Sequence, residues 1–343
     1  MTSANSFSSL KAMDSHINAH GGNLLQACQE YSGDPKEWVD LSTCINPHSY
    51  SFSLNADSLH RLPDFCALEN LGNLARTTYG AANNVFVTPS AGIQAIINAL
   101  PYVLPCRHVS IASPTYSEYA RAFHNAGWDV VETPEPCPDK GCVVLVHPNN
   151  PDGKIWNKDY VDSICHNAEY VIIDESFIDT DSKLSFVSAL NSEKIIVLRS
   201  LSKFYGLAGV RLGFALTGEE IYTRLKKYFG PWSVSGPAIA AGFAALSDTK
   251  WQENTKRILK NQAETLDALI ANATNWRKVG GTSLFALYDI GDTGKLSLDW
   301  HRFLARNRIW TRVFSFSQSW LRLGMPGSVI AWARLAAALE AAK

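Results

Sequence analysis

Residues 198–213 read LRSLSKFYGLAGVRLG, and they follow an apolar run that predicts a strand. Lys203 therefore lies just past a strand end, among hydroxyls, glycines and aromatic side chains. An ammonium in such surroundings loses its proton at low cost, as a lysine that forms a Schiff base must. Ser200 and Ser202 can donate to phosphate oxygens, and Arg211 can pair with the same anion. We interpret the stretch as a lysine-centred anion site rather than an ordinary surface loop.

The sequence around this stretch alternates short apolar runs with helical stretches. This alternation is typical of an α/β domain with a mainly parallel sheet, here of seven strands. Ligands bind such open sheets at the carboxyl ends of the strands, so the residues after each strand become candidates. The predicted strands are 85–88, 108–112, 129–132, 143–147, 170–174, 195–199 and 212–216, and helices fit at 91–100, 117–126 and 159–167.

The pattern changes after Gly230-Pro231, where the residues predict a smaller α+β domain. Its predicted helices are 237–246, 251–271, 296–307 and 328–341, and its strands are 283–289, 309–314 and 321–323. We expect three parts: an N-terminal arm over residues 1–60 that packs on the small domain, a large domain over 61–233, and the small domain over 234–343.

Composition excludes several classes of protein. The chain has 343 residues, and 31 Lys+Arg against 32 Asp+Glu give a net charge of −1, without the basic excess of a nucleic-acid binder. No apolar run approaches the roughly 18–20 residues of a membrane helix, and residues 1–10 lack the layout of a secretory signal. Seven cysteines without a C-x-x-C pair argue against a disulfide framework or a zinc site. We predict a cytoplasmic protein that has no metal site and binds neither nucleic acid nor membrane.

The string S-x-S-K, with an arginine eight residues after the lysine, resembles the cofactor signature of the aspartate-aminotransferase superfamily. This resemblance implies fold type I and a pyridoxal 5′-phosphate cofactor joined to Lys203. It also implies that Ser200 and Arg211 bind the cofactor phosphate.

Three further segments match this resemblance. Asp174 ends the strand in YVIIDESF, residues 170–177, where its carboxylate would keep the pyridine nitrogen protonated. Asn150 lies in HPNNPDG, residues 147–153, which resembles the family's N-P-x-G loop and would bond the ring 3′-oxygen. Tyr116, in a P-x-Y segment, would stack on the ring. The alternatives are a turn-capping Asp, a simple Asn-Pro-Asp-Gly turn and a core aromatic.

A turn of small residues supplies the remaining phosphate contacts. Ser90, Ala91 and Gly92 follow a strand and open a helix, with Gln94 just beyond. Free backbone N–H groups and the helix dipole make such a junction an anion site, although alone it is an ordinary strand–turn–helix connection.

Two N-terminal segments narrow the resemblance to one group within the superfamily. HGGN at 20–23 and DLSTCINP at 40–47 are similar to threonine-phosphate decarboxylases of cobalamin synthesis, close relatives of histidinol-phosphate aminotransferase. The resemblance implies decarboxylation of L-threonine O-3-phosphate to (R)-1-aminopropan-2-yl phosphate by a homodimeric lyase. An aminotransferase that uses 2-oxoglutarate is the alternative, and a non-catalytic protein on the same fold is a second one.

A phosphorylated amino acid has two anions to bind, so extra cationic and amide donors are expected. The candidates for substrate binding are Arg312, Arg322, His20, Gly22, Asn46 and Asn150. Which arginine takes which anion is left open.

Three positions depart from the family pattern. Phe177 stands where many aminotransferases have a tyrosine that bonds the 3′-oxygen, which argues against ordinary transamination. Leu62 replaces a tyrosine that reaches the partner subunit's cofactor phosphate, and Cys44 replaces glycine or asparagine.

Overall fold

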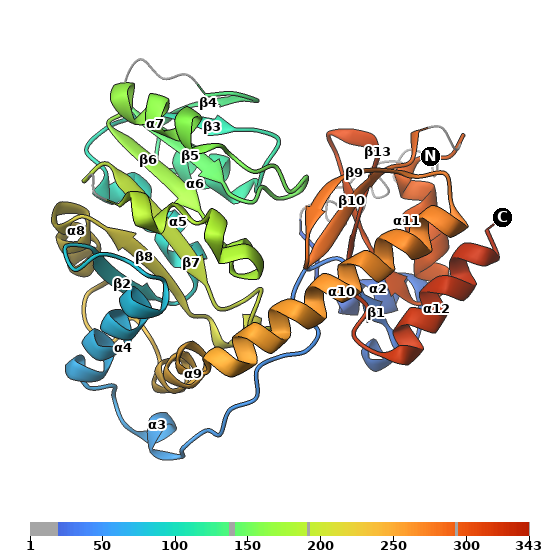
Figure 1. Ribbon diagram of the computed structural model, residues 1–343, viewed down its shortest axis with the longest axis horizontal. Coiled ribbons are helices and arrows are strands. Elements are labelled where there is room, and N and C mark those ends of the chain that lie inside the picture. Colours follow the sequence, from blue (N-terminus) through green and yellow to red (C-terminus); the bar gives the residue numbers. More distant parts are fainter. Residues whose placement is uncertain (1–19, 137–140, 191–192, 292–293, 343) are drawn as a thin grey trace, which may run out of the picture. The chain divides into compact units, whose positions relative to one another are not determined.

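The computed structural model describes residues 20–136, 141–190, 193–291 and 294–342, so the polar segment 1–10 lies outside the described residues. The chain forms two compact units, shown in Figure 1. The large unit is His48–Ile258, and the small unit combines the residues up to Pro47 with those from Leu259 onward. The domain limits expected from the sequence, after residues 60 and 233, stay a prediction.

The large unit contains a seven-stranded sheet in the order β2-β8-β7-β6-β5-β3-β4. The neighbours from β7 to β4 pair in parallel, and β8 is antiparallel to both β2 and β7. A mainly parallel sheet of seven strands is therefore confirmed. The strands are β2 (Phe86–Ser90), β3 (His108–Ala112), β4 (Asp129–Thr133), β5 (Cys142–Val146), β6 (Tyr170–Asp174), β7 (Ile195–Ser200) and β8 (Gly213–Thr217).

The central strands are apolar at nearly every position because both faces of the sheet are covered. Val144, Ile172 and Ile196 face one core cluster, which they share with α5, α6 and α8. Their neighbours along the chain, such as Leu145 and Ile173, are equally buried and point to the opposite face, since side chains alternate along a strand. The helices of this unit are α3 (Asp57–His60), α4 (Phe65–Thr78), α5 (Ile93–Val103), α6 (Glu118–Asn125), α7 (Lys158–Asn167), α8 (Glu219–Phe229) and α9 (Gly236–Ser247).

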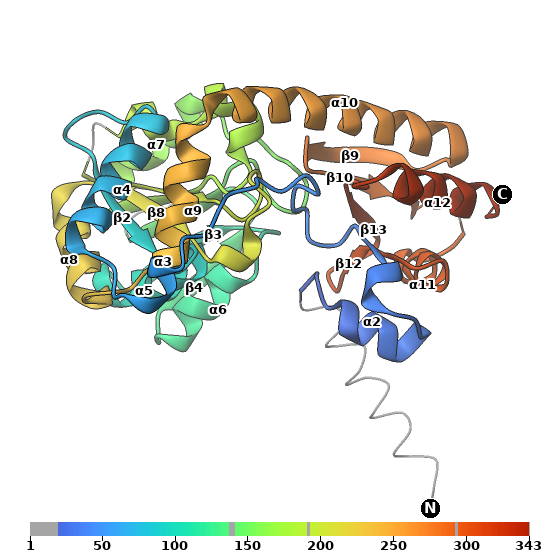
Figure 2. The same cartoon turned by 90° about the horizontal axis from the view of Figure 1, so that it is seen from below.

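The small unit has two sheets. A parallel pair joins β1 (Val39–Asp40) to β11 (Ile309–Trp310), and an antiparallel sheet has the order β12-β13-β10-β9. Helix α10 (Thr249–Ala273) enters this unit from residue 259 and runs beside the sheet in Figure 2. The remaining elements are α2 (Leu24–Tyr31), β9 (Arg277–Thr282), β10 (Phe285–Asp289), α11 (Ser297–Arg306), β12 (Arg312–Phe314), β13 (Ser317–Gly324) and α12 (Val329–Glu340). Among the described residues, each helix is too short or too polar to span a bilayer.

A buried histidine in the small unit carries a consequence for acid stability. His301 on α11 is almost fully buried, and its Nδ1 lies 2.9 Å from the Thr311 hydroxyl oxygen. Burial, followed by the charges of Arg302 and Arg312, lowers the pKa of His301 to about 4. The folded protein thus keeps this imidazole neutral at a pH where the unfolded chain would protonate it.

We expect this histidine to destabilise the fold in acid. Between about pH 6.5 and about pH 4 the unfolded state binds a proton that the folded state does not, so stability falls as pH falls, by about 3 kcal/mol in total. Urea unfolding near neutral pH and near pH 4.5 should show a shallower pH dependence for His301→Gln than for wild type. His124→Gln, at an exposed position on α6, serves as the control. Equal pH dependence in wild type and His301→Gln would contradict the expectation.

Candidate active site

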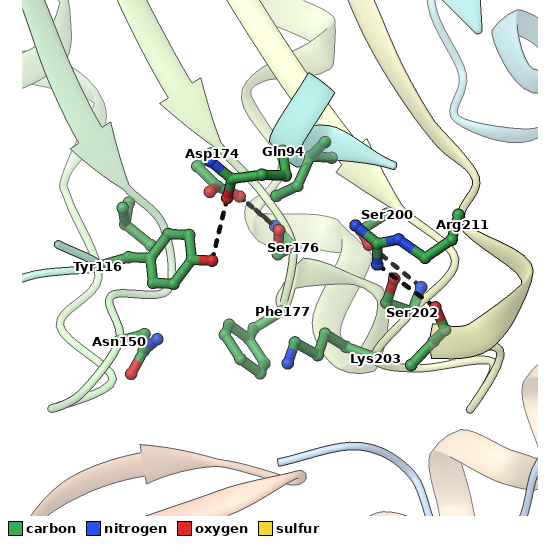
Figure 3. Close-up of a pocket in the computed structure, with 13 residues that line it drawn as sticks. Gln94, Tyr116, Asn150, Asp174, Ser176, Phe177, Ser200, Ser202, Lys203 and Arg211 are labelled. Atoms are coloured by element: carbon green, nitrogen blue, oxygen red, sulfur yellow. Dashed lines mark hydrogen bonds between the residues drawn. The ribbon is translucent and has the colours of Figure 1, made fainter. Parts of the chain in front are cut away.

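The candidate residues of the large unit meet at one edge of its sheet. β2, β3, β5, β6 and β7 run in the same direction, so the segments that follow them reach the same edge. β8 runs the opposite way, so the segment that precedes it, with Arg211, reaches this edge too. Figure 3 shows the resulting pocket. It is lined by Ile93, Gln94, Tyr116, Val146, Asn150, Asp174, Ser176, Phe177, Ser200, Ser202, Lys203, Ala208 and Arg211.

Asp174 lines this pocket at the end of β6, where it is 2% exposed. One carboxylate oxygen, Oδ1, accepts hydrogen bonds from the Ser176 backbone N–H (2.9 Å) and hydroxyl (2.6 Å). The other, Oδ2, accepts one from the Tyr119 hydroxyl (2.9 Å). Burial raises the pKa of Asp174, and these bonds, with the charge of Lys203, oppose that rise. A cationic group placed beside this carboxylate would stabilise its ionised form.

Lys203 lines the same pocket, in the loop after β7. Its Nζ lies 5.6 Å from the centre of the Phe177 ring, and Figure 3 shows the two side by side. Phe177 is buried, so at the position where the sequence departs from many aminotransferases the lysine faces an aromatic ring. Leu62, the second departure, is 69% exposed at the surface of the large unit.

Small and hydroxylated residues surround Arg211 at the other end of the pocket. Gly92 has φ +78°, a conformation that favours glycine, and a Cβ built on it would lie 2.8 Å from an Arg211 guanidinium nitrogen, so a larger residue would displace this arginine. The Ser200 hydroxyl oxygen accepts from the Ser202 backbone N–H (3.1 Å), which leaves its own proton for another acceptor. The Ser90 hydroxyl is engaged within the fold, since it lies within bonding distance of the backbone oxygens of Gly92 (3.0 Å) and Gly213 (3.3 Å).

Tyr116 is held in the pocket by Gln94, which the sequence placed only beside the small-residue turn before α5. Its hydroxyl donates to Gln94 Oε1 over 3.1 Å, a bond drawn in Figure 3, and Gln94 also reaches Glu118. Burial, then the charge of Glu118, raises the pKa of Tyr116 to about 12, so this hydroxyl stays neutral near pH 7. Sequence reasoning also missed Tyr119 and Ser176 as partners of Asp174. Serine two residues after a strand-end aspartate was the available signal for Ser176.

The two candidate arginines belong to the small unit, whereas the pocket residues belong to the large unit. Arg312 on β12 is the direct cross-strand partner of Arg322 on β13. Arg322 donates to the Ser42 carbonyl oxygen (2.8 Å), and its guanidinium lies 5.4 Å from the centre of the Phe285 ring. Burial, followed by the charge of Arg322, lowers the pKa of Arg312 to about 10. Two like charges held this close favour an anionic ligand.

The N-terminal candidates belong to this same small unit. The Gly22 backbone N–H donates to the Ser42 hydroxyl oxygen (2.8 Å), so the turn that starts at His20 is tied to residue 42. Asn46, six residues after the end of β1, is buried. Cys44, the third departure, is buried with φ +55°, a left-handed conformation that is uncommon for residues other than glycine. The small unit therefore contains His20, Gly22, Asn46, Arg312 and Arg322, and the large unit contains the remaining candidates.

The chain belongs to the class I and II aminotransferases, whose family model matches residues 53–337. Within that family it is similar to the threonine-phosphate decarboxylases of Sinorhizobium sp. and Pseudomonas aeruginosa. The first is 34% identical over 93% of this chain and 97% of its own length, and the second is 36% identical over 93% and 96%.

The fold is also similar to that of a solved structure. The histidinol-phosphate aminotransferase from Sinorhizobium meliloti, determined with pyridoxal-5′-phosphate, superposes with a TM-score of 0.73 at 16% identity. The superposition covers 93% of this chain and 94% of that one. The resemblance inferred from the sequence and the fold class are thus confirmed.

Proposed function

We propose that this chain is a pyridoxal-phosphate-dependent lyase that decarboxylates L-threonine O-3-phosphate. The products are carbon dioxide and (R)-1-aminopropan-2-yl phosphate, which would serve cobalamin synthesis. The observation that carries the proposal is the pocket that brings Lys203, Asp174, Asn150 and Arg211 together at one sheet edge. The likeness to threonine-phosphate decarboxylases along nearly the whole chain supports the choice of substrate.

The residues of the pocket fit pyridoxal phosphate. The cradle at Gly92, which a Cβ would fill, together with Arg211, Ser200 and Ser202, provides donors for a phosphate group. Asp174, buried and already held by three hydrogen bonds, suits a protonated ring nitrogen. Ser90, Ala91 and Gly92, the phosphate contacts also expected from the sequence, are not among the residues that line the pocket; they form the turn before α5, in which Gly92 lies beside the Arg211 guanidinium.

When bound, the cofactor supplies a sink for the electron pair that remains on Cα when carbon dioxide leaves. Lys203 provides the amine that holds the coenzyme and later returns a proton to Cα. With a protonated ring nitrogen beside it, Asp174 would be held in its ionised form and would balance that positive charge. Tyr116 and Asn150 hold the ring in place, with the Tyr116 hydroxyl anchored on Gln94.

The substrate carries two anions, and we propose Arg312 and Arg322 as the cationic groups of its binding site. An arginine fork matches the oxygens of both carboxylate and phosphate. If these arginines mainly bind the phosphate, the carboxylate is free to leave the plane of the ring, as decarboxylation requires. His20, Gly22 and Asn46 are proposed as further contacts from the same unit.

Replacing Arg322 by alanine is expected to raise KM for phosphothreonine about 10- to 100-fold, because charge-assisted hydrogen bonds of about 1.5–3 kcal/mol are lost. Arg322→Lys, which keeps the charge without the fork, should recover part of the affinity. Steady-state kinetics measure both variants. Arg277→Ala, an exposed arginine on β9, is the control and should keep the wild-type KM. An Arg322→Ala enzyme with unchanged KM would remove this arginine from the substrate site.

The reaction type is decided by incubation with phosphothreonine. Release of carbon dioxide without any keto acid supports the decarboxylase. A requirement for 2-oxoglutarate would instead establish the aminotransferase alternative. A correctly folded protein that stays colourless with added cofactor would favour the non-catalytic alternative.

We further propose that the enzyme is a cytoplasmic homodimer. The large unit exposes several apolar side chains around α3 and α4, which a second copy could cover: Leu59, Leu62, Phe65 and Trp232. Light scattering coupled to size-exclusion chromatography tests this, and a monomeric mass at micromolar concentration would contradict it.

A further inference from the structure

Two loops carry the side chains proposed to hold the ring, and they follow neighbouring strands. Tyr116 lies in the loop after β3, and Asn150 lies in the loop after β5, which pairs directly with β3. Figure 3 shows Tyr116 and Asn150 on the same side of the pocket. The backbone pairing between the two strands ends at Ile111 and Val144, before the loops begin, so it does not hold the loops together.

One buried amide connects these two loops. Asn149, only 5% exposed, precedes Asn150 in the chain. Its Oδ1 accepts a hydrogen bond from the Thr115 hydroxyl (2.6 Å), and its Nδ2 donates to the Pro114 carbonyl oxygen (3.0 Å). The second Nδ2 hydrogen goes to Asp152 Oδ1 within its own loop (2.8 Å). Both amide hydrogens and the amide oxygen are thus engaged.

The residue's backbone has a separate task. The Asn149 N–H donates to the Lys154 carbonyl oxygen (2.9 Å), and the Asn149 carbonyl accepts from the Gly153 N–H (2.7 Å). These backbone bonds close the loop at residues 149–154. A side-chain substitution therefore removes the link between the loops and leaves this closure in place.

We propose that Asn149 is a positioning residue that fixes Tyr116 and Asn150 relative to each other and so shapes the cofactor site. An aspartate cannot replace it, because a carboxylate would face the Pro114 carbonyl and Asp152 without a donor. Alanine reaches neither partner. The proposal rests on the proposed function only through the identity of the cofactor.

The test is a double-mutant cycle between Asn149→Ala and Thr115→Val, with the dissociation constant of pyridoxal phosphate and the kcat for phosphothreonine as readouts. Asn149→Ala should weaken cofactor binding about 10- to 100-fold, and Thr115→Val should weaken it less. Because Thr115 acts through Asn149, adding Thr115→Val to Asn149→Ala should change nothing further. Asn157→Ala is the matched control: it removes a helix-capping bond to the Tyr160 N–H in the same region and should keep wild-type affinity.

Wild-type cofactor affinity in a folded Asn149→Ala protein would overturn the proposal, and so would full additivity of the two substitutions. If Asn149→Ala does not fold, Thr115→Val alone decides, because it removes only the hydroxyl that bonds Asn149. Weakened binding of pyridoxal phosphate by this variant supports the proposal, and unchanged binding overturns it. A wild-type enzyme that binds the cofactor yet releases no carbon dioxide would refute the proposed reaction while this cycle still reports on Asn149.

Discussion

Lys203→Ala is expected to lower kcat by at least about four orders of magnitude, because in the proposed function the amine is both the nucleophile that holds the coenzyme and the proton donor to Cα. Among the described residues that line the pocket, Lys203 is the only lysine, so no neighbouring lysine can replace it there. The yellow colour of the protein with added pyridoxal phosphate should disappear as well. Carbon dioxide release and the visible absorbance spectrum measure the two effects.

Two controls separate chemistry from folding in this experiment. Lys226→Ala changes an exposed lysine on α8 and should keep wild-type activity. A small amine added in solution should restore part of the activity of Lys203→Ala, since it enters the space that the side chain vacates. Retention of more than about one hundredth of wild-type kcat would contradict the assigned role, given that lost nucleophiles cost far more.

Asp174→Asn is expected to lower kcat on the order of 10³-fold, because losing one member of a buried charge pair costs about 3–5 kcal/mol. Asparagine has nearly the same shape and can still accept from Ser176, so the change removes charge more than structure. Steady-state kinetics on the purified variant give the number, and its unfolding midpoint shows whether the fold survives. Asp159→Asn, near the start of α7, is the charge-matched control. A loss of less than tenfold would mean that the carboxylate does not balance a charge on the ring.

The candidate site was largely predictable because its residues follow strands. Asp174 stands at the end of an unbroken apolar run, and Lys203 follows the next strand. Because parallel strands end at the same edge of a sheet, both residues were expected at that edge. Tyr119 could not be assigned in this way. Its hydroxyl reaches Asp174 across 55 residues of chain, and from sequence it is one more aromatic on an amphipathic helix.

The fold shows where local patterns stop being informative. The run 309–314 predicts one strand, and the structure has two in different sheets, because the buried Thr311 interrupts the run and lies against His301. β9 was not predicted, because the residues RKVGGT neither alternate between apolar and polar nor favour a strand strongly. Its backbone pairing with β10 holds this segment in the strand conformation. In both cases a tertiary contact outweighs the local preference.

The claim that the pocket at Lys203 holds pyridoxal phosphate can be measured directly. The protein is incubated with the coenzyme, reduced with borohydride and digested, and mass spectrometry locates the phosphopyridoxyl group. We predict a single modified peptide with the label on Lys203, and none when that residue is alanine. Label on a different lysine, or no label on a folded protein, would contradict the account.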